Sequence, residues 1–452
     1  MKSKFASVST RGPMKKQALT GTVLVSLLSL LIMGAGRARS VRQPAAVTGP
    51  TFSNEISRIF QANCQNCHHP GDVAPFSLMT YRDALPWLNA IRHVTATRQM
   101  PPWKPSPGCG DFEQTRTLSE EQIDTIGTWI ANGAPEGDRT KLPKPLEFDD
   151  GWSLGQPDLV LKLQEPYTPP PRGDIYRCFP LPTNLTNEQF VSAIDIRPGD
   201  RESVHHVIAY IDTTGQVDSS GKVIKPFQSE LLDAKDPGPG YTSFGGPGFD
   251  ITNFQSATLG GWAPGARPVL LPEGVAMSLP GNARVVLQIH YHPHHGKPLP
   301  DKTEIGLYLS KKPPAKVLNM IPIINTSFVI PAGVKEHRVN ATWPIPVFTP
   351  IHLVSVAPHM HLLGKTMKVE AAKPDGTKEC LINIEDWDFN WQGQYQFKTP
   401  VALPAGSRLS LSATYDNSES NPRNPNRPPK TVRWGEGTTD EMCLAFIGFT
   451  VD

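Results

Sequence analysis

The most informative chemistry in this sequence lies in five consecutive residues, Cys64-Gln65-Asn66-Cys67-His68. Two thiols at this spacing, followed at once by a histidine, can attach a haem covalently and supply an axial imidazole to its iron. A zinc site would need a second Cys or His pair nearby, and Cys109 alone does not provide one. The motif therefore predicts a covalent haem c on Cys64 and Cys67, with His68 as an iron ligand.

Met100 is the predicted second axial ligand. It follows a predicted helix, and two prolines stiffen the loop behind it. Trp103, next along this loop, is expected to pack on the porphyrin. Met79 is the alternative ligand, but it lies only eleven residues after His68, which leaves little chain to cross the haem.

Histidines further along the chain gather in ways that could bind metal. His359 and His361 are two residues apart, so on an extended strand both imidazoles point to one face and can chelate one ion. Adjacent His205 and His206 point to opposite faces of a regular strand. Both can reach one metal only through opposite ring nitrogens, or where the strand bulges or ends.

Two further residues extend these pairs. His290 lies on the polar face of its predicted strand, where a histidine is more often exposed than ligating, and His294 and His295 fall in a predicted loop. Met442 precedes the last apolar strand, a position usually filled by a core residue. Joined to the pair of His359 and His361, it would make a soft set that suits Cu(I) as readily as Cu(II), whereas three histidines suit copper or zinc.

The elements that must position these residues fall into two kinds. Predicted helices at 53–68, capped by Ser53 with Ser57, at 81–98, and from a capping box at Ser119-x-x-Gln122 form a small all-α unit at residues 50–137. Its size is that of a small cytochrome c domain. A linker rich in Lys, Pro, Asp and Gly follows at 138–156.

The remaining 300 or so residues read as all-β. Short alternating stretches recur between Pro and Gly turns, at 159–163, 204–211, 284–292, 353–356, 408–414 and 444–451. This length suggests two β-sandwiches, with the boundary at 300–320 and the domains drawn at 157–305 and 306–452.

The whole-chain composition excludes several classes. The 44 Lys+Arg and 42 Asp+Glu leave a net charge of +2, which implies no nucleic-acid partner. Six cysteines in 452 residues are too few for a disulfide scaffold, and no pairing can be assigned among Cys109, Cys178, Cys380 and Cys443.

Residues 1–40 have the order of a secretory signal. Lys15 and Lys16 precede an apolar run at 19–35, which ends in small residues. The run is also nearly long enough to remain as a membrane anchor. Either way the rest is expected to be exported, to the periplasm or to its membrane face, which agrees with haem c attachment outside the cytoplasm.

From about residue 150 onward the chain resembles the copper type II, ascorbate-dependent monooxygenases, the family of peptidylglycine α-hydroxylating and dopamine β-monooxygenases. The matching stretches, in family order, are Val204-His205-His206-Val207, Trp262-Ala263-Pro264-Gly265 with Leu271-Pro272-Glu273-Gly274, Leu287-Gln288-Ile289-His290-Tyr291, His359-Met360-His361-Leu362-Leu363-Gly364-Lys365 and Asp440-Glu441-Met442-Cys443.

The resemblance implies two consecutive jelly-roll-like β-sandwiches, each holding one copper. The electron-transfer copper would be bound by His205, His206 and His290. The catalytic copper, where O₂ and the substrate C–H bond react, would be bound by His359, His361 and Met442.

Three departures from the family concern the substrate. A family arginine that holds the substrate carboxylate is replaced by Ala357, a substrate-contacting tyrosine by Phe446, and an asparagine by Leu444. A glycine-extended peptide is therefore not the expected substrate, and a more apolar pocket is. Cys178 and Cys443 stand at family cysteine positions without their usual partners.

These features together predict an exported copper monooxygenase that hydroxylates an organic substrate with O₂ and receives electrons through the fused haem. A soluble cytochrome or small reductant would supply those electrons. The alternative is a non-catalytic periplasmic copper and haem protein for electron transfer or copper handling. A dihaem enzyme is disfavoured because there is no second CxxCH.

Overall fold

The computed structural model describes residues 48–451 apart from residues 73, 149–151, 219, 252–256, 265 and 293–297. The predicted signal or anchor at 1–40 and the loop histidines His294 and His295 therefore lie outside the described residues. Among the residues that are described, no helix is long and apolar enough to span a membrane.

The described chain begins with a small helical unit. Its elements are a π-helical turn η1 (Phe52–Ile56), α1 (Ser57–Asn63), α2 (Tyr81–Ala84), η2 (Leu85–Trp87), α3 (Leu88–Ala96), α4 (Glu120–Ala131) and η3 (Arg139–Lys141). The Ser119–Gln122 capping box at the start of α4 is confirmed. The predicted cap at Ser53 and Ser57 is wrong, because the helical segment begins at Phe52 without a side-chain cap and both serines are buried.

Aromatic packing holds this helical unit together. Phe52, Phe60 and Trp129 are almost fully buried and meet at ring-centroid distances of 6.1 to 6.3 Å. Ile56 and Ile126 complete the core from α4 and the η1 turn. The unit therefore has its own hydrophobic core, which lies next to the Cys64–His68 segment at the end of α1.

The first β-sandwich consists of two five-stranded sheets. One has the order β1-β11-β3-β9-β12, with bounds Leu159–Lys162, Glu304–Leu309, Gln189–Arg197, Val275–Leu279 and Lys316–Val317. The other has the order β7-β2-β10-β4-β8, with bounds Tyr241–Thr242, Ile175–Pro182, Arg284–Tyr291, Val204–Asp212 and Thr258–Trp262. A hairpin of β5 (Gln216–Val217) and β6 (Val223–Lys225) and the helix α5 (Gln228–Asp233) are inserted after β4.

The second β-sandwich consists of two four-stranded sheets. One has the order β13-β22-β16-β19, with bounds Asn319–Ile324, Leu444–Val451, Ile351–His359 and Tyr395–Leu403. The other has the order β15-β20-β17-β18, with bounds His337–Pro344, Arg408–Tyr415, Gly364–Ala372 and Lys378–Ile384. A short ribbon pairs β14 (Val329–Ile330) with β21 (Val432–Arg433).

All six alternating stretches expected to be strands are strands, and each sandwich has its own core. The domain boundary predicted at 305/306 does not coincide with the end of a strand. It would cut β11, which pairs with β1 and β3 of the first sandwich. The division falls after β12 and before β13, inside the expected window of 300–320.

The loop between α3 and α4 of the helical unit packs on the second sandwich. Phe112 forms a bridge with Phe397 and is part of that core, and Trp103 packs edge-on against Tyr395, with ring centroids 5.3 Å apart. A disulfide joins Cys109 of this loop to Cys380 in β18. Trp103, which was expected to pack on a porphyrin, has ring contacts with Phe112 of the same loop and with Tyr395 of the second sandwich.

Candidate metal and substrate site

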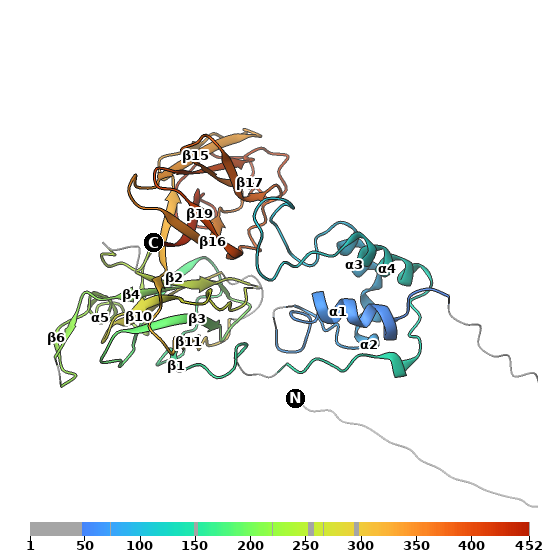
Figure 1. Ribbon diagram of the computed structural model, residues 1–452, viewed down its shortest axis with the longest axis horizontal. Helices are drawn as coiled ribbons and strands as arrows, with labels where there is room; N and C mark the ends of the chain where they lie inside the picture. Colours follow the sequence, from blue (N-terminus) through green and yellow to red (C-terminus); the bar gives the residue numbers. More distant parts are fainter. Residues whose placement is uncertain are drawn as a thin grey trace, which may run out of the picture. The chain divides into compact units, whose positions relative to one another are not determined.

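A β-bulge brings together the first group of histidines. β4 and β10 lie side by side in one sheet (Figure 1), where His206 pairs with His290 and Val204 pairs with Tyr291. His205 is therefore the extra residue between two paired positions, and its side chain is no longer forced to the face opposite His206. One nitrogen of each of His205, His206 and His290 lies within 4.8 Å of the other two.

His290 is buried rather than exposed, contrary to the expectation for a polar strand face. It is 1% exposed and stacks on Tyr176 at 4.2 Å between ring centroids. Its face of β10 is covered, because Val286 on that face packs against Tyr241 and Gln288 donates to the carbonyl oxygen of Gly246. The segment around residues 241–246 thus turns the polar face of this strand into interior.

The free nitrogen of His290 points to metal binding. Nε2 lies 3.0 Å from Oδ1 of Asp174, whereas Nδ1 is buried and has no hydrogen-bond partner among the described residues. Burial lowers the pKa of His290, although the Asp174 carboxylate opposes the effect. The neutral ring that results is the form that binds metal, and the carboxylate on Nε2 leaves Nδ1 as the ligand atom.

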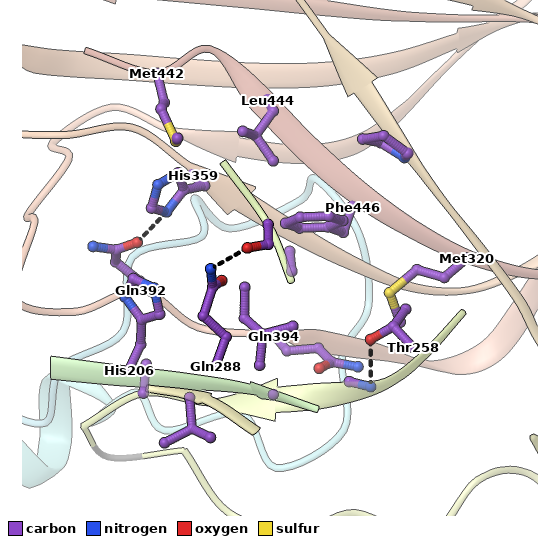
Figure 2. A pocket seen from close by; sticks show the side chains of 18 of the residues that line it. His206, Thr258, Gln288, Met320, His359, Gln392, Gln394, Met442, Leu444 and Phe446 are labelled. Atoms are coloured by element: carbon purple, nitrogen blue, oxygen red, sulfur yellow. Dashed lines mark hydrogen bonds between the residues drawn. The ribbon is translucent and has the colours of Figure 1, made fainter. Parts of the chain in front are cut away.

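The second group lies where β16 ends and β22 begins. The His359 and His361 rings have centroids 5.1 Å apart, and His359 pairs with Leu444 across the two strands. Met442 comes just before β22, and Figure 2 shows its thioether beside the His359 ring. His359 thus lies close both to His361 and to Met442.

Contacts to Nδ1 leave Nε2 as the available nitrogen of both the His359 and the His361 ring. Nδ1 of His359 contacts Oε1 of Gln392, and Nδ1 of His361 lies 3.1 Å from the carbonyl oxygen of Asp440. Burial lowers the pKa of His359 to about 4 and that of His361 to about 3. Both rings are therefore neutral at physiological pH, with Nε2 left to bind a metal.

Three buried side chains that we did not single out from the sequence hold this second group in place. The carboxylate of Glu441 accepts hydrogen bonds from the backbone N–H groups of His361 at 2.9 Å and Leu363 at 2.5 Å. Tyr415 donates to the carbonyl oxygen of Met442, and Trp387 donates to that of His361. The position of Glu441 next to Met442 is the one feature of the sequence that could have pointed to its role. No feature of the sequence pointed to Tyr415 or Trp387.

The two histidine groups are neighbours. The His206 and His359 rings have centroids 6.2 Å apart, although they come from different sandwiches. Phe389 of the second sandwich stacks on His205 at 4.4 Å and meets the edge of His361 at 5.8 Å. Phe389 therefore contacts one histidine of each group.

A cavity of about 300 Å³ opens beside both groups. His206, His359 and Met442 line it, and Figure 2 shows the last two with Leu444 and Phe446 around the same space. The three positions that depart from the resembling family, namely Ala357, Leu444 and Phe446, all belong to its wall. A small molecule in this cavity would contact residues of both histidine groups.

A second cavity, of about 720 Å³, contains the four residues predicted to hold a haem. Cys64, Cys67, His68 and Met100 all line it, whereas Met79 is not among the described residues that do. Nδ1 of His68 lies 3.0 Å from the carbonyl oxygen of Phe76, which leaves Nε2 for the cavity. Burial lowers the pKa of His68, so the ring is neutral, as an iron ligand must be.

The first sandwich supplies part of the wall of this haem cavity. His205 and His292 line it, together with Arg267, whose guanidinium contacts the carbonyl oxygen of Asn66. Nη1 of Arg201 lies 2.9 Å from Oδ1 of Asp72 in the helical unit. One of the metal-site histidines, His205, thus borders the cavity that would hold the haem.

Comparisons with known proteins agree with the C-terminal geometry. Residues 314–450 match the family described as the copper type II ascorbate-dependent monooxygenase, C-terminal domain. DBH-like monooxygenase protein 1 of Mus musculus is 23% identical over 299 residues, covering 62% of this chain and 44% of the relative. Peptidyl-glycine alpha-amidating monooxygenase A of Xenopus laevis is 24% identical over 309 residues, covering 66% of this chain and 29% of the relative.

The chain thus spans less than half of the length of these relatives. Among solved structures, the major capsid protein P2 from Bacteriophage PM2 aligns with a TM-score of 0.23 and 10% identity, over 64% of this chain and 96% of that chain. That likeness is too low to inform function. The sequence matches support a relationship between the β region and the copper-dependent monooxygenases.

Proposed function

We propose that this relative of the copper type II monooxygenases is an exported enzyme that hydroxylates a C–H bond of an organic substrate with O₂. One observation carries the proposal: His206 of the first group and His359 of the second line the same cavity, beside Met442. The reaction places one oxygen atom in the C–H bond and releases the other as water, with two electrons and two protons consumed. A cavity bordered by two metal sites suits such a reaction.

The donor sets of both groups fit copper. His205, His206 and His290 offer three nitrogens around one point, including the buried Nδ1 of His290, which has no hydrogen-bond partner in the part of the chain that the structure describes. His359, His361 and Met442 offer two nitrogens and a thioether, a set soft enough for Cu(I). When bound, the two copper ions would store one electron each, and the one at Met442 would activate O₂.

The protein's own contribution is orientation and exclusion of water. Asp174, Gln392 and the Asp440 carbonyl hold one nitrogen of each ring, so that the other nitrogen would be left to a bound metal ion. Apolar side chains around the cavity, Leu444 and Phe446 among them, keep water from the reacting C–H bond.

The helical unit is proposed to carry a covalent haem c on Cys64 and Cys67, with His68 and Met100 as axial ligands. This haem would pass single electrons to the first copper site, because His205 of that site borders the haem cavity. A soluble cytochrome or small reductant would reduce the haem in turn. Stopped-flow mixing of protein that carries reduced haem and Cu(II) tests the relay: a haem that stays reduced in the presence of O₂ would rule it out.

Export is supported by the Cys109–Cys380 disulfide, because structural disulfides persist in oxidising compartments. The N-terminal segment would direct the chain to the periplasm, as a cleaved signal or as an anchor.

Incubation with ¹⁸O₂, a reductant and a mixture of organic compounds tests the hydroxylase itself. The expected result is one ¹⁸O atom in a product, formed only when the protein contains about two coppers per haem. Consumption of O₂ without labelled product from any compound would favour the alternative, an exported electron-transfer or copper-handling protein.

A further inference from the structure

We propose that the substrate is a small, uncharged and mainly apolar molecule, bound in the cavity that His206 and His359 line, without an ion pair to a side chain. The inference deepens the proposed function, on which it rests in treating this cavity as the substrate site. It adds the charge and the size of the molecule that the site selects.

The volume of the cavity limits the size of the substrate. At about 300 Å³ the cavity lies at the lower end of the range of about 300–1,000 Å³ that is usual for ligand pockets. A peptide segment or a long chain would not be enclosed. A molecule of roughly one ring with a short substituent would be.

The residues that line the cavity indicate which charge the substrate can carry. None of the described residues that line the cavity is a lysine or an arginine. A substrate carboxylate would therefore lose its water without gaining an ion pair with a basic side chain.

The single carboxyl group among the described lining residues, that of Glu436, does not reverse this argument. Burial is the main cause that raises its pKa, and the nearby Asp440 adds to the effect. Its carboxyl group also accepts a hydrogen bond from the backbone of Gly245, so it is already engaged within the wall.

Most polar side chains in the wall are already engaged by the protein. Gln288 donates to the carbonyl oxygen of Gly246 at 2.7 Å, and Thr258 donates to that of Ala209 at 3.0 Å. Gln392 contacts His359 and donates to the carbonyl oxygen of Phe389. These groups hold the wall, and a substrate rich in hydrogen-bonding groups would find few partners there.

The cavity is most apolar next to the second metal site. Ala357 pairs with Phe446, and His359 pairs with Leu444, across the adjacent strands β16 and β22. Hydrocarbon side chains thus stand directly beside the histidine that would hold the catalytic metal. This arrangement would place a C–H bond, rather than a polar group, at the reacting end.

Calorimetric titration of the copper- and haem-loaded protein without O₂ tests the proposal, because binding then needs no turnover. Three probes share a phenyl ring and a two-carbon chain: 2-phenylethanol, 3-phenylpropanoate and 2-phenylethylamine. We expect the alcohol to bind at least ten-fold more tightly than either ion. Equal or tighter binding of either ion, or no binding of the alcohol at millimolar concentration, would overturn the proposal.

A charge placed in the wall locates the binding site. Ala357→Arg should tighten binding of 3-phenylpropanoate at least ten-fold and weaken that of the alcohol, and Ala357→Lys provides the same charge on a slimmer side chain if the arginine variant does not fold. Ala402→Arg is the matched control, since Ala402 is exposed on β19 of the same sheet. An unchanged preference in both Ala357 variants would contradict the assignment. Absence of hydroxylation in the ¹⁸O₂ experiment would leave this binding preference intact, so the two proposals fail separately.

Discussion

The carboxylate of Asp174 accepts a hydrogen bond from Nε2 of His290 at 3.0 Å, and the same oxygen contacts Nδ1 of His292. Its other oxygen accepts a hydrogen bond from the backbone N–H of Thr438, at 3.1 Å, in the segment that leads to Met442. His292 lines the haem cavity. One side chain therefore touches the first histidine group, the haem cavity wall and the loop of the second group.

Replacing Asp174 by asparagine should weaken copper binding at the first site. A carboxylate on the outer nitrogen of a ligating imidazole fixes the ring and raises its basicity, and its loss typically costs about 10–100-fold in metal affinity. Competition with a chromophoric chelator measures this affinity, and the Cu(II) EPR spectrum should change with it. Asp375→Asn is the control, because Asp375 is exposed and bonds only within its own turn, to Thr377. Native affinity and spectrum in Asp174→Asn would show that Asp174 does not act through His290.

Replacing Met442 by alanine should abolish hydroxylation and leave the haem spectrum unchanged. The thioether lies beside His359 at the second site, far along the chain from the haem residues, and alanine offers no ligand atom. Product formation and the optical spectrum are measured on the same sample. Met367→Leu, in the buried core of the same sandwich, keeps the volume nearly constant and should remain active. Undiminished turnover in Met442→Ala would remove this residue from the site.

Replacing Met100 by alanine should change the haem while Met79→Ala should not. Met100 lines the haem cavity, and a neutral thioether ligand raises the reduction potential of the iron. We expect the potential to fall by on the order of 0.1 V, within the span of about 0.8 V over which axial ligands act. Spectroelectrochemical titration gives the value. A fall in Met79→Ala, with Met100→Ala unaffected, would exchange the two assignments.

Local patterns in the sequence predicted most elements and the pairing of His359 with His361, whereas the grouping of His290 with His205 and His206 came from the family resemblance. Alternation of apolar and polar residues marked strands such as β4 and β10, and the spacing of His359 and His361 marked a chelating pair. Whether a strand face is buried, however, depends on segments that are distant in the sequence. His290 is buried because a distant segment covers its strand face, and no pattern within β10 shows that cover.

The contacts between domains were also beyond sequence reasoning. Phe112 reads as a loop residue of the helical unit, yet it enters the core of the second sandwich beside Phe397. The closeness of His206 to His359 depends on how two separately predicted sandwiches meet. Such contacts join residues more than 150 positions apart, and one sequence alone carries no signal for them.

The disulfide between Cys109 and Cys380 should make a large contribution to stability, because it joins residues 271 positions apart. In the chain-entropy view, a cross-link that closes so long a loop restricts the unfolded chain strongly, and loss of such a bond costs about 2–5 kcal/mol. Cys109→Ser with Cys380→Ser should therefore unfold at a lower denaturant concentration than the native protein. Intrinsic tryptophan fluorescence follows the transition.

The same double variant should slow electron transfer from haem to copper without changing the haem spectrum. The disulfide holds the α3–α4 loop on the second sandwich, where the backbone N–H of Ser106 donates to the carbonyl oxygen of Asn383 at 2.7 Å. Cys178→Ala is the matched control, since Cys178 is a buried free thiol and its loss should leave the rate of haem oxidation at its native value. Stability equal to that of the native protein, together with an unchanged rate of haem oxidation in stopped flow, would show that the bond neither stabilises the chain nor positions the haem unit.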